Sequence, residues 1–268
     1  MNHIYLEHVS LTYPIYSTSA RSLKKSLLAV GSGGQISAAS GNIIVKALDD
    51  ISLEINSGDK VGLIGANGAG KSSFLKLIAG IYSPQHGKVS IKGSIASLLN
   101  LTLGMDEEAT GYDNIYMKCL IMGLTRKQIK SIIPDIEAFT ELSNYLSMPI
   151  RTYSNGMRLR LGFAISTSIH PDILLLDEVI GVGDNAFMAK AEQRLNAMIE
   201  KVSILLLASH DNHTIEKFCN KAILFNQGKI LAYGSTQEVL HIYYTNNQAV
   251  INADNSLSNT KILSAENN

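Results

Sequence analysis

The first part of the chain alternates hydrophobic and polar residues with a period of two, which predicts β-strands with one buried face. Residues 4–11 form the first such stretch. We expect this strand to end before Pro14, because proline has no backbone donor for a ladder. Residues 51–55 alternate in the same way, and shorter strands are predicted around 89–91 and 95–99.

Three later stretches are almost wholly apolar, which is typical of parallel strands that are covered on both faces. They lie at 61–64, 173–176 and 204–208. Further along, residues 222–225 and 229–232 flank a short turn that contains glycine, and this pattern predicts a hairpin. The strands therefore combine a buried parallel sheet with a hairpin.

Helical patterns occupy the regions between these strands. A helix is predicted at about 70–79, and Gly80 follows it at the position where glycine commonly ends a helix. The block 106–145 is expected to form a helical subdomain, and another helix is predicted at 159–168. The block divides into helical segments at 112–122, 126–133 and 134–145.

Two segments depart from this regular pattern. Residues 15–44 form an insertion between two strands, with a short amphipathic stretch at 22–30 and then a part rich in glycine and serine. The insertion is interpreted either as a mobile surface excursion or as an amphipathic element that touches a membrane or a membrane-bound partner. Residues 246–268 are polar and rich in asparagine, and they are predicted to form a tail.

Composition and charge narrow the class of protein. Of the 268 residues 46% are hydrophobic, so the chain has enough apolar residues to bury a core and is not expected to be disordered. The 23 basic and 23 acidic residues balance, which argues against nucleic acid as a partner. Cys119 and Cys219 fit neither a disulfide framework nor a zinc site, so reduced thiols are expected.

The chain also lacks the usual signals for secretion or membrane insertion. Its first ten residues have no apolar core typical of a signal peptide, and no apolar run approaches the ~18–20 residues of a spanning helix. We therefore expect a soluble, cytosolic protein, and this expectation still permits docking onto a membrane protein.

The most specific chemical motif is GANGAGKS at 65–72, which fits the phosphate-loop pattern between a predicted strand and a predicted helix. Its glycines let backbone N–H groups point at phosphate oxygens, and the helix adds its positive N-terminal end. Lys71 supplies a charge for the β- and γ-phosphates, and the Ser72 hydroxyl is placed to bind Mg²⁺. The candidate nucleotide-binding set is Gly65, Ala66, Asn67, Gly68, Ala69, Gly70, Lys71, Ser72 and Ser73.

Two of the buried strands end in polar residues, at the edge where parallel sheets place ligands. Asp177 follows the strand at 173–176 and is a candidate ligand of Mg²⁺. Glu178 comes next and is placed to polarise an attacking water as a general base. His210 follows the strand at 204–208, where its imidazole is a candidate to contact the γ-phosphate or that water.

A second helix start carries a free hydroxyl and small residues. The sequence YSNGMR at 153–158 precedes the helix at 159–168, and Ser154 is expected to be its N-cap. Ser154, Asn155 and Gly156 are also suited to phosphate binding. Because one nucleotide does not need two such sites in one subunit, the pattern suggests a dimer with ATP between the phosphate loop of one subunit and residues 154–156 of the other.

In this order, GANGAGKS, YSNGM, ILLLDE and ASHD resemble the motifs of the ATP-binding-cassette (ABC) ATPases over about residues 1–243. The resemblance implies an α/β fold of the P-loop NTPase type. Its parts are a RecA-like parallel-sheet core, an antiparallel β subdomain and an inserted helical subdomain at about 106–168. It also implies an ATPase domain at 1–245, ATP and Mg²⁺ as cofactors, and a homodimer.

The same resemblance implies roles for single residues outside the phosphate loop. Asp177 with Glu178 corresponds to the Walker B motif, and His210 corresponds to the switch histidine. Asp184 falls in the D-loop. Residues 154–156 fall in the signature motif.

Two positions match the family less directly. Tyr13 resembles the aromatic residue that stacks on adenine, and a tyrosine that merely ends a strand is the alternative. Asn100 is the nearest match to the loop glutamine that contacts Mg²⁺ and the membrane subunit in most ABC ATPases.

The departures from the common ABC pattern point to one branch. The signature reads YSNGM in place of LSGGQ, and the stretches at 148–163 and 98–115 are similar to the ATPase subunits of bacterial polysaccharide exporters. That branch implies export of a lipid-linked polysaccharide, with O-antigen preferred, and two membrane-spanning permease subunits as partners. It places the chain peripherally on the cytoplasmic face of the inner membrane. The helical block and the Asn100 loop are its expected coupling surface.

Other functions remain open at this point. Within transport, the cargo could be a capsule, a teichoic acid, a drug or a lipid. A soluble ABC ATPase outside transport is less expected, because the chain carries one cassette and no sustained heptads. A non-catalytic nucleotide-binding scaffold is disfavoured because Lys71 and Glu178 are both present.

Overall fold

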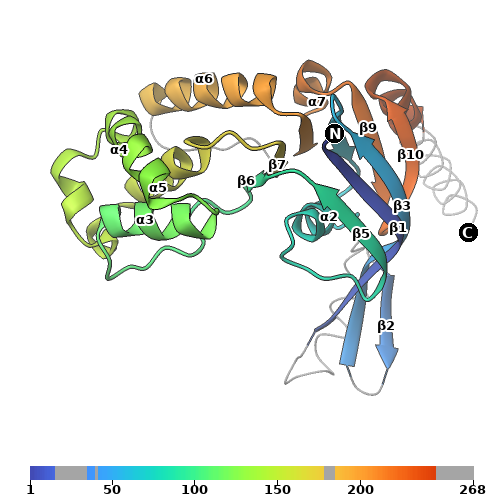
Figure 1. The fold of residues 1–268 in the computed structure, drawn as a ribbon. Helices are drawn as coiled ribbons and strands as arrows, with labels where there is room; N and C mark the ends of the chain where they lie inside the picture. The colour runs from blue at the N-terminus through green and yellow to red at the C-terminus, as the bar shows by residue number, and fades with distance from the viewer. Residues whose placement is uncertain (16–34, 40–41, 178–184, 246–268) are drawn as a thin grey trace, which may run out of the picture.

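The structure is a computed structural model that describes residues 1–15, 35–39, 42–177 and 185–245. Figure 1 shows two sheets on one side of the molecule and a group of helices on the other, with the long helix α6 (Asn185–Lys201) running between them. The predicted stretch at 22–30 and the predicted tail lie outside the described residues.

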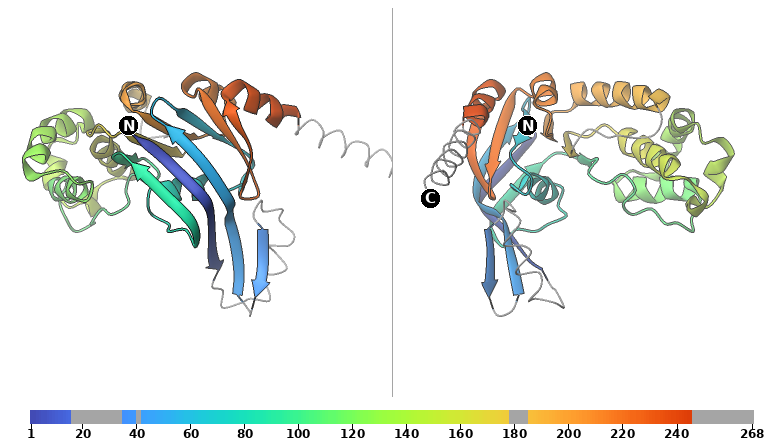
Figure 2. Two further views of the ribbon diagram at one scale, coloured as in Figure 1. Left: turned by 45° about the vertical axis from the view of Figure 1, so that its right-hand side comes forward. Right: turned by 180° about the vertical axis from the view of Figure 1, so that it is seen from behind.

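The first sheet is antiparallel and has the strand order β2-β3-β1-β5. Its strands are β1 (His3–Ile15), β2 (Gln35–Ala39), β3 (Asn42–Asn56) and β5 (His86–Lys92). Figure 2 shows that β2, together with the ends of β1 and β3 beside it, extends beyond β5. Part of the predicted insertion is therefore a hairpin that lengthens this sheet, which the alternation pattern did not predict.

The prediction that Pro14 ends the first strand is wrong. Strand β1 continues to Ile15, and Pro14 lies opposite Ile44 of β3. The pairing of β1 with β5 reaches only Ser10 opposite His86, so β3 is the one strand of the described residues that pairs with β1 at Pro14. A proline is tolerated there because one side of the strand needs no ladder donor.

The second sheet has the strand order β10-β9-β4-β8-β7-β6. Its strands are β4 (Lys60–Ile64), β6 (Ile95–Ser97), β7 (Ile173–Asp177), β8 (Ile204–Ala208), β9 (Lys221–Asn226) and β10 (Lys229–Ser235). All neighbouring pairs are parallel except β9 with β10, which form the predicted hairpin. The predicted buried parallel sheet is thus confirmed, and the carboxyl ends of β4, β7 and β8 meet at one edge.

Both faces of the second sheet are covered. One face packs against the first sheet and α2 (Lys71–Ile78), with Phe74 and Phe225 among the fully buried side chains. The other face packs against α6, α7 (Asn212–Phe218) and the helical residues 236–245. This double cover explains why the parallel strands have continuous apolar sequences.

The helical block has its own core. It consists of α3 (Gly111–Ile121), α4 (Arg126–Thr140) and α5 (Asn155–Thr167), with short 3₁₀ turns at Ser143–Ser147 and Ile150–Thr152. Its buried side chains form a cluster separate from those of the sheets. The predicted helical subdomain is therefore present between β6 and β7.

The predicted division into helical segments 126–133 and 134–145 is also wrong, because α4 passes through Pro134 without interruption. Pro134 and Lys130, whose carbonyl loses its helical donor, are both exposed, so water is available to that carbonyl. Ile129 and Ile136 are fully buried on the opposite side and hold both halves of the helix against the block.

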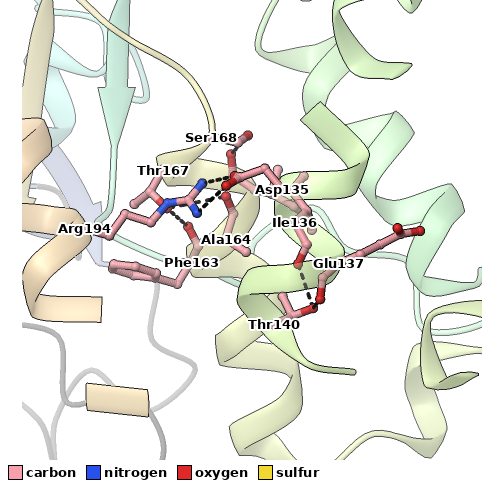
Figure 3. Close-up of polar contacts among 10 residues, drawn as sticks. Asp135, Ile136, Glu137, Thr140, Phe163, Ala164, Thr167, Ser168 and Arg194 are labelled. Atoms are coloured by element: carbon pink, nitrogen blue, oxygen red, sulfur yellow. Dashed lines mark hydrogen bonds and ion pairs between the residues drawn. The ribbon is translucent and has the colours of Figure 1, made fainter. Parts of the chain in front are cut away.

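Helix α6 joins the block to the sheets through polar and aromatic contacts. Figure 3 shows Arg194 of α6 reaching Asp135 of α4, and one of these contacts joins Arg194 Nη1 to Asp135 Oδ1 at 3.2 Å. The same guanidinium lies 4.4 Å from the ring centroid of Phe139. One arginine therefore connects two helices that flank different cores.

Candidate active site

A cavity of about 550 Å³ opens where β4, β7 and β8 end. Its walls come from the loop after β4, the start of α2, the ends of β7 and β8, and the strands β1 and β3 of the first sheet. The lining residues are Tyr13, Val45, Ala47, Ala66, Asn67, Gly68, Ala69, Gly70, Lys71, Ser72, Ser73, Leu99, Asp177, Ala208, Ser209 and His210.

The loop between β4 and α2 has a backbone that only glycine fits at two positions. Gly65 has a φ of 143°, and a Cβ there would lie 2.4 Å from the Phe225 carbonyl oxygen. Gly70 has a φ of 117°, and a Cβ there would lie 2.9 Å from the Ala47 carbonyl oxygen. The glycines thus let the loop lie directly on neighbouring backbone and keep its curl at the helix start.

Lys71 lies inside this loop. Its side chain is buried, and Nζ donates to the carbonyl oxygens of Gly65 and, at 3.1 Å, Ala66. The ammonium is therefore held at the centre of the loop, where backbone N–H groups and the N-terminus of α2 add to its positive field. Ser72 and Ser73 follow on the first turn of α2 and also line the cavity.

Asp177 and His210 reach the cavity from neighbouring strands. Asp177 is half-buried and lies opposite Ala208 in the parallel register of β7 and β8. His210 lies two residues after Ala208 in the sequence; it is exposed and lines the cavity. Glu178 and Asp184 lie outside the described residues.

Asp211, next to His210, belongs to the helix rather than to the cavity. Its carboxylate accepts hydrogen bonds from the backbone N–H groups of His213 at 3.1 Å and Thr214 at 3.2 Å, so it caps α7. The hydrogen bond from the Thr214 hydroxyl is the largest cause that lowers the pKa of Asp211. The polar run after β8 is thus divided between capping and cavity lining.

Tyr13 enters the cavity from β1 of the first sheet. Its ring lies 6.0 Å from that of Tyr82, and its neighbours in the cavity wall include Val45 and Ala47 of β3. We did not predict these two residues, nor Leu99, because apolar wall residues carry no motif. Val45 and Ala47 lie two residues apart on β3 and therefore point to the same face of the strand, which was the signal available in the sequence.

Two sets of predicted residues are not brought to this cavity. Asn100 is exposed, and its Oδ1 accepts from the N–H and hydroxyl of Thr102, both at 3.3 Å. Ser154 caps α5 as predicted, accepting from the Met157 N–H at 3.2 Å. Among the described residues that line the cavity, none comes from α5.

The helices and the two cysteines of the chain give two further observations. Among its described residues, no helix is both long enough and apolar enough to cross a membrane. Cys119 and Cys219 are both buried and free of disulfides. Burial raises the pKa of the Cys119 thiol to about 11 and that of the Cys219 thiol to about 12.

Comparison with known proteins identifies the family to which this arrangement of residues belongs. Residues 48–181 match the ABC transporter family. The O-antigen export system ATP-binding protein RfbE of Yersinia enterocolitica is 45% identical over 241 residues, which cover 90% of this chain and 100% of that protein. The chain belongs to the ABC transporter family. As a member of the family it is an ATP hydrolase, which confirms the resemblance seen in its motifs.

Other relatives extend the comparison. The O-antigen export system ATP-binding protein RfbB of Klebsiella pneumoniae is 35% identical over 240 residues, covering 90% of this chain and 96% of that protein. The teichoic acids export ATP-binding protein TagH of Bacillus cereus is 42% identical over 197 residues. That match covers 74% of this chain and only 36% of TagH, so the chain spans about a third of that relative.

Solved structures confirm the predicted ABC ATPase fold. An ATP-binding subunit of an ABC transporter superposes with a TM-score of 0.65 at 21% identity, covering 90% of this chain and 92% of the other. A dimeric ATP-binding cassette in a post-hydrolysis state, bound to ADP and Pi, gives a TM-score of 0.62 at 18% identity. That match covers 87% of this chain and 98% of the other.

Proposed function

We propose that this ABC ATPase is the energy-supplying subunit of an exporter that moves a lipid-linked polysaccharide, in first place O-antigen, across the bacterial inner membrane. The observation that carries its ATPase role is the cavity in which the phosphate loop, Asp177 and His210 meet. The O-antigen assignment is supported by the names of RfbE and RfbB, which align with this chain over most of their length.

In this proposal Lys71 and the loop N–H groups bind the β- and γ-phosphates of ATP. The loop geometry supports this role, because the Lys71 ammonium already lies among carbonyl oxygens that a phosphate oxygen can replace as its partner. Tyr13 lies in the same cavity and is proposed to stack on the adenine. The nucleotide is thereby held with its γ-phosphate toward the ends of β7 and β8.

The residues present fit Mg²⁺ as well. Ser72 and Asp177 place a hydroxyl and a carboxylate on one cavity, and hard oxygen ligands are what this ion prefers. When bound, Mg²⁺ neutralises phosphate charge as it develops during hydrolysis. Asn100 is a proposed further ligand, although its amide is bonded to Thr102 in this structure.

The proton chemistry is assigned to Glu178 and His210. Glu178 directly follows Asp177 and is proposed to accept a proton from the water that attacks the γ-phosphate. His210 lines the cavity and is proposed to hydrogen-bond the γ-phosphate. Hydrolysis then breaks the bond between the β- and γ-phosphates and releases ADP and inorganic phosphate.

A second copy of the chain is proposed to complete the pocket. Ser154, Asn155 and Gly156 lie at the start of α5, outside the cavity of their own chain, and this supports a role toward the nucleotide of a partner copy. Asp184 is proposed to contribute at the same junction between copies. Loss of the γ-phosphate would then release the two copies from each other.

Two membrane-spanning permease subunits are the proposed partners, on the cytoplasmic face of the membrane. Their docking surface is proposed at the helical block and the loop before it. This is supported by three exposed apolar residues, namely Leu103 at 63%, Leu120 at 48% and Ile121 at 78% exposure. A teichoic acid is the second candidate cargo, because TagH of Bacillus cereus is 42% identical over the aligned part.

The ATPase role is tested with Lys71→Ala and Glu178→Gln. Lys71→Ala should lose nucleotide affinity, and Glu178→Gln should keep ATP binding, lose turnover and trap a closed dimer. Binding is measured with a fluorescent ATP analogue, turnover by phosphate release, and dimerisation by light scattering. Unchanged turnover in Glu178→Gln would refute its role as general base, and unchanged binding in Lys71→Ala would refute the phosphate-loop assignment.

The cargo is tested in cells. Deleting the gene should leave lipid-linked polymer on the cytoplasmic side of the inner membrane, and the intact gene should restore its export. Chemical analysis of the stranded polymer separates O-antigen repeats from teichoic acid. Normal surface polysaccharide in the deletion strain would exclude both cargoes.

A further inference from the structure

Lys118 of α3 is a buried cation outside the nucleotide cavity. Its exposed fraction is 9%, and its Nζ donates to the carbonyl oxygens of Leu101 at 2.6 Å and Leu103 at 3.3 Å. Burial of an ammonium costs free energy unless hydrogen bonds compensate it, and here the acceptors are two carbonyls rather than a carboxylate. The cost is visible in the pKa of Lys118, which desolvation lowers to about 8.

Both carbonyls belong to one loop, residues 98–105, which we call the bridging loop because it connects β6 with the helical block. At its start the Leu98 N–H donates to the Leu175 carbonyl of β7 at 3.0 Å. Leu99 lines the nucleotide cavity, and the Leu101 side chain is buried in the core beneath the second sheet. The carbonyl that Lys118 binds is thus only two residues from the cavity wall.

The Leu101 carbonyl is also in close contact with a second helix of the block. A Cβ added to Gly162 of α5 would lie 2.3 Å from this oxygen, so α5 approaches it as closely as a glycine permits. Lys118 of α3 and Gly162 of α5 therefore fix the same peptide unit from two helices. Movement of the block must carry this peptide unit with it or break these contacts.

The outer side of this arrangement carries the apolar residues of the proposed docking surface. Leu103, whose carbonyl binds Lys118, is exposed on the bridging loop, and Leu120 and Ile121 are exposed at the end of α3. Lys118 thus connects the loop and the helix that together present this surface. A partner that presses on either one acts on the hydrogen bonds of Lys118.

We propose that Lys118 is a positioning residue that couples α3 to the nucleotide cavity by holding the carbonyls of Leu101 and Leu103. In this arrangement a displacement of α3 by a docked partner moves the bridging loop and, with it, the Leu99 wall and Asn100. The inference rests on the proposed function, because it assigns Lys118 a part in coupling hydrolysis to the membrane subunits.

The test uses Lys118→Met in the full chain, since methionine keeps an apolar unbranched side chain but has no donors. Turnover should fall about tenfold, the size of one charge-assisted hydrogen bond, while nucleotide affinity stays within about twofold because the phosphate loop is untouched. Hydrogen exchange should become faster at the amides of Thr102, Leu103 and Met105, which close the turns of the bridging loop. A purely structural role would lower the melting temperature without this split.

Two further variants make the result decisive. Lys130→Met makes the same substitution at an exposed position on α4 and should behave as the wild type. Gly162→Ala displaces the Leu101 carbonyl without changing Lys118 and should give the same split as Lys118→Met, which keeps the test valid if the methionine variant does not fold.

The proposal is overturned if either folded variant, Lys118→Met or Gly162→Ala, shows wild-type turnover and wild-type exchange in the bridging loop. That result would leave the proposed function standing, provided that Lys71→Ala loses nucleotide affinity in the same assays. Normal nucleotide binding in Lys71→Ala would instead remove the proposed function and this inference together.

Discussion

Lys118 has a charge whose contribution to stability depends on pH. Its pKa is about 8 in the folded chain against an ordinary value of 10.5, so the unfolded chain binds more protons between these two values. Stability must therefore rise with pH across this window, since the penalty of the buried charge is complete below pH 8 and disappears toward pH 10.5. We expect this gain to be at most about 3 kcal/mol.

The measurement compares urea unfolding of the wild type and Lys118→Met from pH 7.5 to 10.5. The difference between them isolates Lys118 from other groups, including Cys119, whose pKa is raised to about 11 by burial. The free energy of unfolding of the wild type should increase relative to the variant as the pH rises. Parallel curves would show that the folded and unfolded chains titrate alike at this residue.

The residues of the cavity differ in how far they could be predicted. Lys71 and Asp177 could be predicted because each follows a strand in a short, locally defined motif, and the structure places both on the cavity. Val45 and Leu99 could not, because an apolar side chain becomes a cavity wall only through the register of the strand or loop that carries it. Asn100 was assigned from its position alone, and its role toward Mg²⁺ stays a prediction, since its amide oxygen accepts from Thr102 in this structure.

Elements were predicted well where sequence pattern and environment agree. The strands at 173–177 and 204–208 are apolar up to Asp177 and Ala208 because both of their faces are covered, so their pattern reports their burial. The two prolines were misread for a common reason. Proline lacks the backbone N–H, but neither position requires that hydrogen bond. Pro14 lies beyond the part of β1 that pairs with β5, and Pro134 lies on an exposed face of α4, where water can reach the carbonyl that loses its donor.

The contact between α4 and α6 gives a prediction at the scale of elements. Arg194 pairs with Asp135 and lies over the ring of Phe139, while its own side chain is 18% exposed. Arg194→Ala should lower the free energy of unfolding by about 1–2 kcal/mol, since a partly exposed ion pair and a cation–π contact each contribute about 1 kcal/mol or less. Asp135→Asn should cost less than Arg194→Ala, because it leaves the ring contact intact.

Urea unfolding followed by circular dichroism provides the measurement for these variants. Lys201→Ala, at an exposed position at the end of the same helix, serves as the control and should stay within about 0.5 kcal/mol of the wild type. An equal cost for Arg194→Ala and Asp135→Asn would mean that the ion pair alone, without the ring of Phe139, holds the two helices together.

At the scale of the whole molecule, the nucleotide cavity and the start of α5 belong to different parts of the chain. The cavity lies at the edge of the second sheet, whereas α5 belongs to the helical block with its own core. Figure 1 shows the block and the sheets as separate bodies joined by α6 and the segments around β6 and β7. This separation agrees with the proposal that two copies of the chain together complete the pocket.

Mixing two inactive variants tests whether the pocket is shared. Among the described residues, a Cβ added to Gly156 would touch only the Ser154 hydroxyl at 3.8 Å, so we expect Gly156→Asp to fit its own chain. An acidic residue also suits the N-terminus of α5. In a shared pocket its carboxylate repels the phosphates of the partner's ATP. Gly156→Asp alone should then be inactive, as is expected of Lys71→Ala. Gly156→Ala is the control, because it adds a small side chain at the same position without a charge.

An equal mixture of the two variants should recover activity, because a mixed dimer has one pocket with an intact phosphate loop and an intact signature. Random pairing makes half of the dimers mixed, and each has one working pocket of two, so about a quarter of wild-type hydrolysis is expected if pockets act independently. Phosphate release is measured after the variants are unfolded together and refolded. Pockets that are complete within one chain would give only the sum of the separate activities, and Gly156→Asp would then hydrolyse ATP by itself.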